Sequence, residues 1–195
     1  MHIELDRRSR QLPSQTLLDA LMQMGEIAAP HFANDLGCGA GPDAVELVSR
    51  GWQVLAIDKD QRFVDRLREK DVNGPLTARV QQWENLSLPP ADLVNASFSL
   101  PFCRPRYFLR CWNTIREAIL PGGFFSGHFF GVHDEWSDRA AMTFHRKEDM
   151  FTLFRDFDLL RLEEIEEEGT AAGLAKHWHL FAVVARKREA AGLAG

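Results

Sequence analysis

Apolar residues in this chain of 195 residues follow the spacing of helices in some segments and that of strands in others. This pattern predicts that helices and strands alternate along the sequence. Leu17, Leu21 and Met24 show the spacing of an amphipathic helix. Ser14 is placed to cap the start of this helix and Gly25 to end it. The first predicted element is therefore a helix between these two residues.

The rest of the chain repeats the order strand, loop, helix. Residues 121–123, Pro-Gly-Gly, are expected to end the fourth helix, and residues 169–173 to connect the last two strands as a hairpin. Further helices are predicted to begin near residues 42, 60, 105 and 146, and strands are predicted near residues 32–36, 54–57, 78–83, 93–97, 124–130, 159–166 and 178–185.

Strands that alternate with helices favour right-handed crossovers, which place neighbouring strands parallel in one sheet. The expected fold is α/β: a doubly wound seven-stranded sheet, mostly parallel, with an antiparallel C-terminal hairpin and helices on both faces. One domain is expected over residues 1–195, with an N-terminal helical segment (1–30), a cofactor-binding core (31–130) and a substrate-side loop with the hairpin (131–195). Ligands bind such sheets beyond the carboxyl ends of the strands, so function is expected there.

A glycine-rich turn lies between the first of these strands and the helix that follows it. Gly37, Gly39 and Gly41 permit a sharp turn and a close approach of the backbone to a ligand, and the start of the helix offers free N–H groups to an anion. This pattern is typical of a site for a nucleotide-like cofactor. Pro42 stands where the dinucleotide fingerprint has its third glycine, which weighs against a nicotinamide cofactor.

An acidic residue at the end of the second of these strands strengthens this interpretation. Asp58 lies 17 residues beyond Gly41, where a carboxylate can accept hydrogen bonds from both hydroxyls of a ribose. The glycine-rich turn and the acid together predict cofactor binding more strongly than either does alone.

The stretch Asp35-Leu36-Gly37-Cys38-Gly39-Ala40-Gly41 resembles the first motif of the class I S-adenosylmethionine-dependent methyltransferases, and the chain is similar to their small tellurite-resistance-like branch. The resemblance implies a Rossmann-like methyltransferase fold with S-adenosylmethionine as the cofactor and S-adenosylhomocysteine as its product. It implies contacts with the methionine part, the ribose, the adenine and the methyl end of the cofactor. The residues expected to make them are Asp35, Gly37, Cys38, Gly39, Asp58, Lys59, Trp83, Glu84 and Ala96.

The methyl acceptor is expected beside the loop after the fifth strand, where residues 129–136 combine aromatic, histidine and acidic side chains. His133 is the candidate catalytic residue. Phe98 and Phe102 are candidates to face the sulfonium cation, with core packing as the alternative. His177 and His179 alternate along one strand, where a packing role is favoured over metal binding, so no metal site is predicted.

Charge and composition limit the class of partner. The net charge of -5 disfavours a nucleic-acid substrate, because phosphate binding needs a basic surface, and a small-molecule acceptor is expected instead. No apolar stretch approaches the ~18 residues that span a bilayer, and no signal segment is recognised at the start. Three cysteines without metal-ligand spacing fit a reducing compartment, so a cytoplasmic location is expected. The oligomeric state is left open.

Three functions are compatible with these patterns. Methyl transfer to a small molecule by in-line displacement is favoured, because holding donor and acceptor in line supplies most of the catalysis and needs no dedicated base. The alternatives are a non-catalytic protein that binds S-adenosylmethionine and, with less support, a nicotinamide-dependent oxidoreductase.

Overall fold

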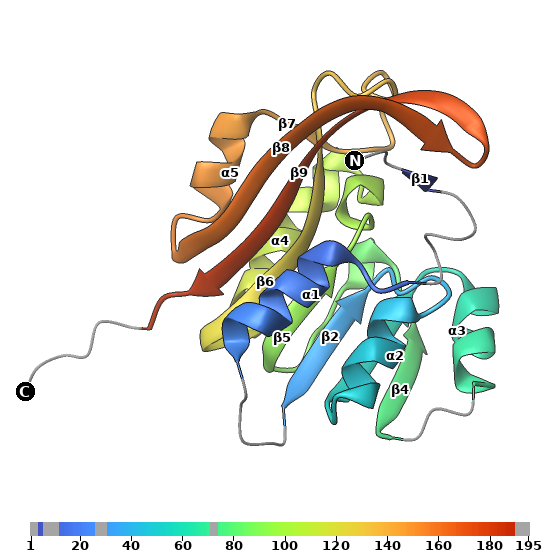
Figure 1. Ribbon diagram of the computed structural model, residues 1–195, viewed down its shortest axis with the longest axis vertical. Helices are drawn as coiled ribbons and strands as arrows, with labels where there is room; N and C mark the ends of the chain where they lie inside the picture. Colours follow the sequence, from blue (N-terminus) through green and yellow to red (C-terminus); the bar gives the residue numbers. More distant parts are fainter. Residues whose placement is uncertain (1–3, 6–11, 26–30, 71–73, 190–195) are drawn as a thin grey trace, which may run out of the picture.

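A nine-stranded β-sheet organises the residues that the computed structural model describes, which are 4–5, 12–25, 31–70 and 74–189. The strand order is β1-β8-β9-β6-β5-β2-β3-β4, and β7 pairs with β6 beside this path (Figure 1). The strands are β1 (Glu4–Leu5), β2 (Phe32–Leu36), β3 (Gln53–Asp58), β4 (Leu76–Val80), β5 (Ala91–Ala96), β6 (Ile119–Gly131), β7 (Phe144–His145), β8 (Phe157–Ala171) and β9 (Leu174–Lys187).

The direction of the strands creates a crevice between β2 and β5. From β2 the chain continues to β3 and β4 on one side, and then returns to β5 and β6 on the other, all in parallel pairs. β9 runs antiparallel between β6 and β8. Loops after β2 and β5 therefore leave the sheet in opposite directions, which opens a ligand-binding crevice at the carboxyl ends of these two strands.

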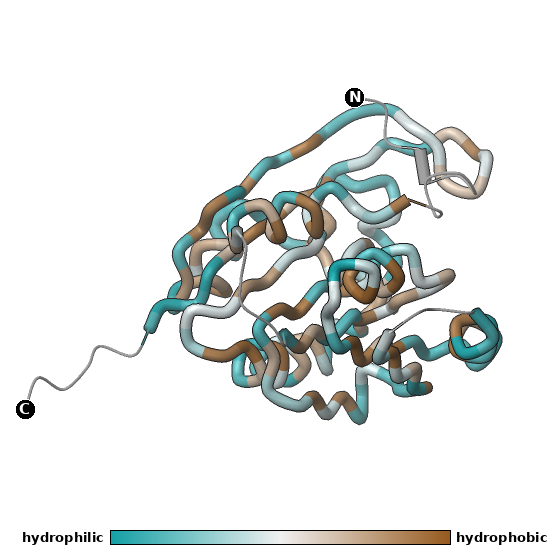
Figure 2. The backbone as a smooth tube through the Cα atoms, turned by 60° about the horizontal axis from the view of Figure 1, so that its bottom comes forward, coloured by the Kyte–Doolittle hydropathy of each residue, from teal (hydrophilic) through white to brown (hydrophobic). Residues whose placement is uncertain are grey.

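Helices cover both faces of the sheet. Alternate strand residues point to opposite faces: Val54 packs with residues of the first three helices, and Leu55 packs with residues of the last two. Figure 2 shows hydrophobic and hydrophilic stretches interspersed along the backbone. None of the helices in the described ranges combines the length and the apolar character needed to cross a membrane. The helices are α1 (Gln15–Met24), α2 (Pro42–Ser49) and α3 (Gln61–Arg68) on one face, and α4 (Pro105–Ala118) and α5 (Lys147–Leu153) on the other.

Aromatic side chains fill the layer between the sheet and the α4 face. The Trp112 ring lies with its centroid 5.3 Å from that of Phe125, 5.7 Å from that of Phe129 and 4.8 Å from that of Phe154, in edge-to-face arrangements that aromatic pairs prefer. Its Nε1 donates a hydrogen bond to the Leu153 carbonyl at 3.1 Å. One side chain of α4 thereby joins β6 and the segment around α5.

The predicted fold class is confirmed, and the differences concern strand ends. The strand expected over 78–83 covers Leu76–Val80 instead, and Trp83 lies in a short 3₁₀ turn, Trp83–Asn85. Residues 121–123 do not separate α4 from a strand, because β6 already begins at Ile119. Ala91 pairs with Ile119 and Leu93 with Phe124, so the Pro-Gly-Gly segment bulges out of the ladder without ending it.

The C-terminal hairpin is longer than expected. β8 has 15 residues and β9 has 14, and the turn between them consists of Ala172 and Gly173, whose φ angles are 54° and 82°. Two central residues with positive φ match the right-handed twist of an antiparallel pair. Gly169 is thus a strand residue paired with Lys176, not part of the connection. The two-residue strands β1 and β7 have no signal in the sequence pattern and bring the seven predicted strands to nine.

Trp112→Ala should lower the free energy of unfolding by about 3–5 kcal/mol, because it leaves a cavity within the aromatic layer. Leu109→Ala is the matched control, since Leu109 lies on the same helix with 68% of its surface exposed. The control should stay within about 0.5 kcal/mol of the wild type. Urea denaturation followed by circular dichroism measures both, and equal losses would contradict the role given to the aromatic layer.

Candidate active site

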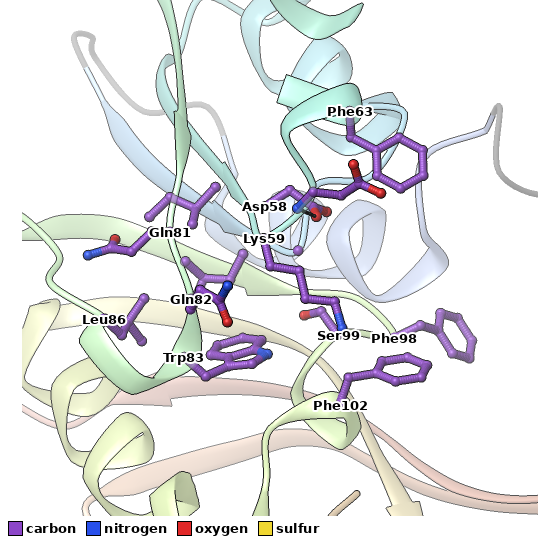
Figure 3. Close-up of a pocket in the computed structure, with 14 residues that line it drawn as sticks. Asp58, Lys59, Phe63, Gln81, Gln82, Trp83, Leu86, Phe98, Ser99 and Phe102 are labelled. Atoms are coloured by element: carbon purple, nitrogen blue, oxygen red, sulfur yellow. Dashed lines mark hydrogen bonds between the residues drawn. The ribbon is translucent and has the colours of Figure 1, made fainter. Parts of the chain in front are cut away.

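A cavity of about 260 Å³ opens at the carboxyl ends of β2 and β3 (Figure 3). Its walls come from four segments that are far apart in the sequence: the end of β2, the end of β3 with the start of α3, the turn after β4, and the segment after β5. This is the crevice that the strand order creates. The residues that line it are 36–37, 57–60, 63, 81–83, 86, 98–99 and 102.

Gly37 brings two walls of the cavity into close contact. Its N–H and that of Cys38 both donate to the Ile57 carbonyl, at 2.7 and 2.9 Å, which ties the glycine turn to the end of β3. Gly37 has a φ of 70°, and a Cβ at this position would lie 2.3 Å from the Cβ of Ser99. Any larger residue would therefore push the segment after β5 away from the glycine turn, since both the backbone angle and the space favour glycine.

Asp58 lies at the end of β3 and organises the floor of the cavity. Its Oδ2 accepts the Gly39 N–H at 2.9 Å and its Oδ1 accepts the Asp60 N–H at 2.8 Å. The residue keeps 9% of its surface exposed and lines the cavity. A carboxylate offers about four lone-pair positions, so Asp58 can hold the loop and still accept hydrogen bonds from a ligand.

Aromatic rings face this carboxylate across the cavity. Figure 3 shows Trp83 and Phe102 on the wall opposite Asp58, with the Lys59 side chain extending toward Phe102. The Lys59 Nζ lies 6.0 Å from the centroid of the Phe102 ring. Flat apolar rings suit the stacking of an adenine, and their faces attract a cation such as a sulfonium.

Phe98 lines the cavity on the side of β6 and has an unusual backbone conformation. Its φ is 49°, a region that residues other than glycine rarely adopt and that often marks functional sites. The ring stacks on His128, with centroids 3.9 Å apart. Burial lowers the pKa of His128 to about 3, so its imidazole is neutral at physiological pH. Phe98 and His128 thus form an uncharged wall.

Asp35 lies beneath the cavity and takes part in a buried hydrogen-bond network. The Asn95 Nδ2 donates to Asp35 Oδ1 and to Asp43 Oδ2, each at 2.8 Å. The Ser14 N–H donates to Asp43 Oδ1 at 2.6 Å, which joins the cap of α1 to this network. Burial and, second, the charge of Asp43 raise the pKa of Asp35 to about 8. Asp35 therefore carries a proton over much of the neutral range.

The structure brings some of the predicted cofactor-binding residues to the cavity and leaves others behind it. Gly37, Asp58, Lys59 and Trp83 line it. The remaining five are not among its lining residues: Asp35, Cys38, Gly39, Glu84 and Ala96. Phe63 on α3 and the residues Gln81, Gln82 and Leu86 after β4 line it without having been predicted, because helix apolar positions read as core and turn residues after a short strand carry no pattern that assigns them to a site.

His133 lies on the loop after β6, outside the lining of the cavity. Its side chain is 64% exposed and stacks on His179, with ring centroids 4.7 Å apart. The Nδ1 atom lies 3.4 Å from Glu166 Oε2. The structure thus places His133 among residues of the C-terminal hairpin, and its catalytic role stays a prediction.

Strand order and cavity together define the class of protein. A doubly wound domain with an antiparallel last strand, a glycine turn and an acid at the end of β3 is built to bind a nucleotide-like ligand. The sequence profile of the methyltransferase domain matches residues 33–123. In this segment, a little under half of the chain, the sequence is similar to the methyltransferase domain family, as its first motif predicted.

Curated relatives with similar sequences are carboxy-S-adenosyl-L-methionine synthases. The protein from Pseudomonas entomophila is 34% identical over 109 residues, which are 49% of this chain and 44% of that protein. The protein from Pseudomonas paraeruginosa is 30% identical over 133 residues, 60% of this chain and 53% of that protein. The chain thus spans about half the length of the curated relatives it matches.

Solved structures share the fold over nearly the whole chain. TehB from Haemophilus influenzae has a TM-score of 0.75 and 16% identity, and the match covers 90% of this chain and 62% of that one. The N-methyltransferase NodS from Bradyrhizobium japonicum, crystallised with S-adenosyl-L-homocysteine, has a TM-score of 0.70 and 16% identity, with 93% and 87% covered. At this level of sequence identity, the structural similarity shows that the fold is shared.

Asp35→Asn should change how stability depends on pH. Between pH 3.8 and about 8 the unfolded wild type has lost the Asp35 proton while the folded protein keeps it, so the free energy of unfolding falls as pH rises. Asparagine does not titrate. The variant should therefore gain stability relative to the wild type across this interval, and the difference should be constant below and above it.

Urea denaturation at a series of pH values measures this difference. Asp65→Asn is the control, because Asp65 is half-exposed on α3 and takes no part in the Asp35 network. A difference for Asp35→Asn that does not vary with pH would contradict the raised pKa.

Proposed function

We propose that this protein binds S-adenosylmethionine in the cavity at the ends of β2 and β3 and transfers its methyl group to a small-molecule acceptor. The observation that carries the proposal is the position of Asp58: a carboxylate beside the glycine turn, facing aromatic rings across the cavity. A methyltransferase domain profile over residues 33–123 and the shared class I fold support the same reading.

The residues of the cavity match the separate parts of this cofactor. Asp58 is the acceptor for the two ribose hydroxyls, and Trp83 is the flat surface for the adenine. The glycine turn leaves room for the methionine part, since a Cβ on Gly39 would meet nothing nearer than the Gly37 carbonyl oxygen at 4.0 Å. Asp35 does not line the cavity. Its role in this proposal is to position the glycine turn through its hydrogen bond with Asn95.

When bound, the cofactor supplies a methyl group on a sulfonium, which any good nucleophile can displace in line. The protein's part is to hold donor and acceptor close and to keep water out. Phe98 and Phe102 present aromatic surface to the positive sulfonium, and the neutral His128 behind Phe98 adds no repelling charge. No residue of this wall needs to act as a base if the acceptor is already a strong nucleophile.

A small acceptor suits the charge of the chain. The net charge of -5 gives no general attraction for a polyanion, so a nucleic-acid substrate is disfavoured and a cytoplasmic metabolite is favoured. The two alternatives weighed from the sequence, a non-catalytic cofactor-binding protein and a nicotinamide-dependent oxidoreductase, are not favoured by the relatives.

A second candidate function is suggested by the name of the curated relatives. Those proteins are synthases of a carboxylated S-adenosylmethionine, so the cofactor itself is what they change. Lys59 is the basic side chain among the lining residues, and its ammonium extends over Phe102. This cation is suited to pair with a carboxylate on the ligand. Mass spectrometry of the nucleoside products after incubation with S-adenosylmethionine, together with a small nucleophile as methyl acceptor or a carboxylic acid as carboxyl donor, distinguishes the two reactions.

Asp58→Asn should weaken the binding of S-adenosylmethionine by about 1.5–3 kcal/mol, or roughly ten- to a hundredfold in Kd, because charged hydrogen bonds to the ribose are lost. Asparagine keeps the size of the side chain and one acceptor oxygen, so one of the two backbone hydrogen bonds to Asp58 is kept. Isothermal titration calorimetry with S-adenosylmethionine, S-adenosylhomocysteine and NAD measures the affinities.

Asp65→Asn serves again as the control and should bind like the wild type. Circular dichroism shows whether Asp58→Asn is folded. Unchanged affinity in a folded Asp58→Asn protein, or wild-type binding of NAD but of neither sulfur compound, would overturn the proposed function.

A further inference from the structure

Three histidines and three glutamates gather on the C-terminal hairpin, away from the cavity. We call them the His–Glu cluster: His133, Glu164, Glu166, Glu168, His177 and His179. They come from three elements, the loop after β6, strand β8 and strand β9. None of the six is among the residues that line the cavity.

The register of the hairpin brings the cluster together. Glu166 pairs with His179 and Glu168 pairs with His177 across the antiparallel ladder. Side chains two residues apart lie on the same face of a strand, so Glu164 joins this face on β8. The loop after β6 then adds His133, whose ring stacks on His179. A face of the hairpin is thereby covered with imidazoles and carboxylates.

The ligand atoms of three members converge. His133, Glu166 and His179 each offer one nitrogen or oxygen atom, and these atoms all lie within 4.8 Å of one another. Glu166 is the central member: its Oε2 lies 3.4 Å from His133 Nδ1, and its Oε1 lies 3.2 Å from His177 Nε2. Imidazole nitrogen and carboxylate oxygen are ligands that suit Zn²⁺ and neighbouring transition-metal ions.

His179 is held through both nitrogens of its ring, and an ion at Nδ1 has to displace the backbone amide that now donates to it. The His133 N–H donates to its Nδ1 at 3.0 Å, which assigns the lone pair of the neutral ring to Nδ1 and its proton to Nε2. Nε2 in turn lies 3.2 Å from Glu164 Oε1. An ion that replaces the amide at Nδ1 leaves Nε2 hydrogen-bonded to Glu164, the carboxylate–histidine–metal arrangement that orients such ligands.

Gly131 is required for this orientation. A Cβ at Gly131 would lie 2.2 Å from His179 Nδ1, so the ring occupies the space that a side chain would fill. The neighbouring loop residue Asp134 is held by a buried ion pair with Lys176 on β9. The loop that carries His133 is therefore anchored to the strand that carries His179.

The charge of the cluster also favours a cation. Lys147 pairs with Glu164, its Nζ lying 3.0 Å from Oε2. In the described part of the chain, the contacts of Glu166 and Glu168 with other side chains are with imidazoles. In that part of the chain neither carboxylate has a lysine or arginine partner, whereas Glu164 has one in Lys147.

We infer that the His–Glu cluster binds a divalent transition-metal ion such as Zn²⁺, with His133, Glu166 and His179 as ligands and Glu164 as the group that orients His179. The bound ion joins the loop after β6 to the hairpin. This assignment is separate from the proposed cofactor site, and it gives His133 a different role from the catalytic one predicted from the sequence. It also runs against the packing role expected for His179.

Equilibrium dialysis of the full chain, freed of any affinity tag, against ZnCl₂ tests the assignment, and Co²⁺ with its visible absorption serves as a second probe. The wild type should bind one equivalent of Zn²⁺. Glu166→Gln and His133→Ala should each weaken binding by more than about tenfold, and Glu164→Gln by about ten- to a hundredfold through the orientation of His179. Glu163→Gln is the matched control, because Glu163 lies on β8 with its side chain on the other face.

All four substitutions are at exposed or half-buried side chains, and circular dichroism with S-adenosylmethionine titration checks that each protein is folded with its cofactor site unchanged. The assignment is supported if the wild type and Glu163→Gln bind Zn²⁺ stoichiometrically and the other three variants bind it more weakly. The absence of saturable binding, or binding that all four variants retain, would overturn it, and binding retained by all four would point to ligands elsewhere, such as cysteine thiols. Neither outcome bears on cofactor binding, so the two proposals fail independently.

Discussion

The amide of Asn95 lies in the middle of the sheet, where β2, β5 and β6 run side by side, and it connects all three. Its Nδ2 donates to Asp35 on β2 and to Asp43 on α2, while its Oδ1 accepts from Ser126 on β6 at 2.8 Å and from Ser97 at 3.1 Å. The side chain is fully buried, so each of these groups would be costly to leave without a partner. This network ties β2, β5, β6 and α2 to one another.

The arrangement of the cavity walls depends on this hydrogen-bond network around Asn95. Gly37 can approach Ser99 closely only while β2 and β5 stay in register, and Asp58 can hold Gly39 only while the glycine turn leaves β2 at the right angle. The aromatic wall has a different origin: Phe98 takes a strained backbone conformation to place its ring on His128. A hydrogen-bonded wall thus faces an apolar wall across the cavity.

The hairpin extends the sheet on the side away from α2 and α3 (Figure 1). Its length brings glutamates of β8 and histidines of β9 into cross-strand pairs, and the loop after β6 is fastened over them by the buried ion pair of Asp134 and Lys176. A buried pair of this kind is costly to break one partner at a time. The loop therefore has a defined position, which is the condition for a metal site that includes His133.

The sequence by itself determined the features that neighbouring residues encode. Ser14 and Gly25 mark the ends of α1, the glycines after β2 permit a tight turn, and Asp58 is the last residue of β3. Tertiary structure decided which of these side chains meet. Asp35 and Asn95 are 60 positions apart, and His133 and Glu166 are 33 apart. Their contacts depend on strand register and on loop packing, which sum small interactions over the whole chain and leave no pattern in adjacent residues.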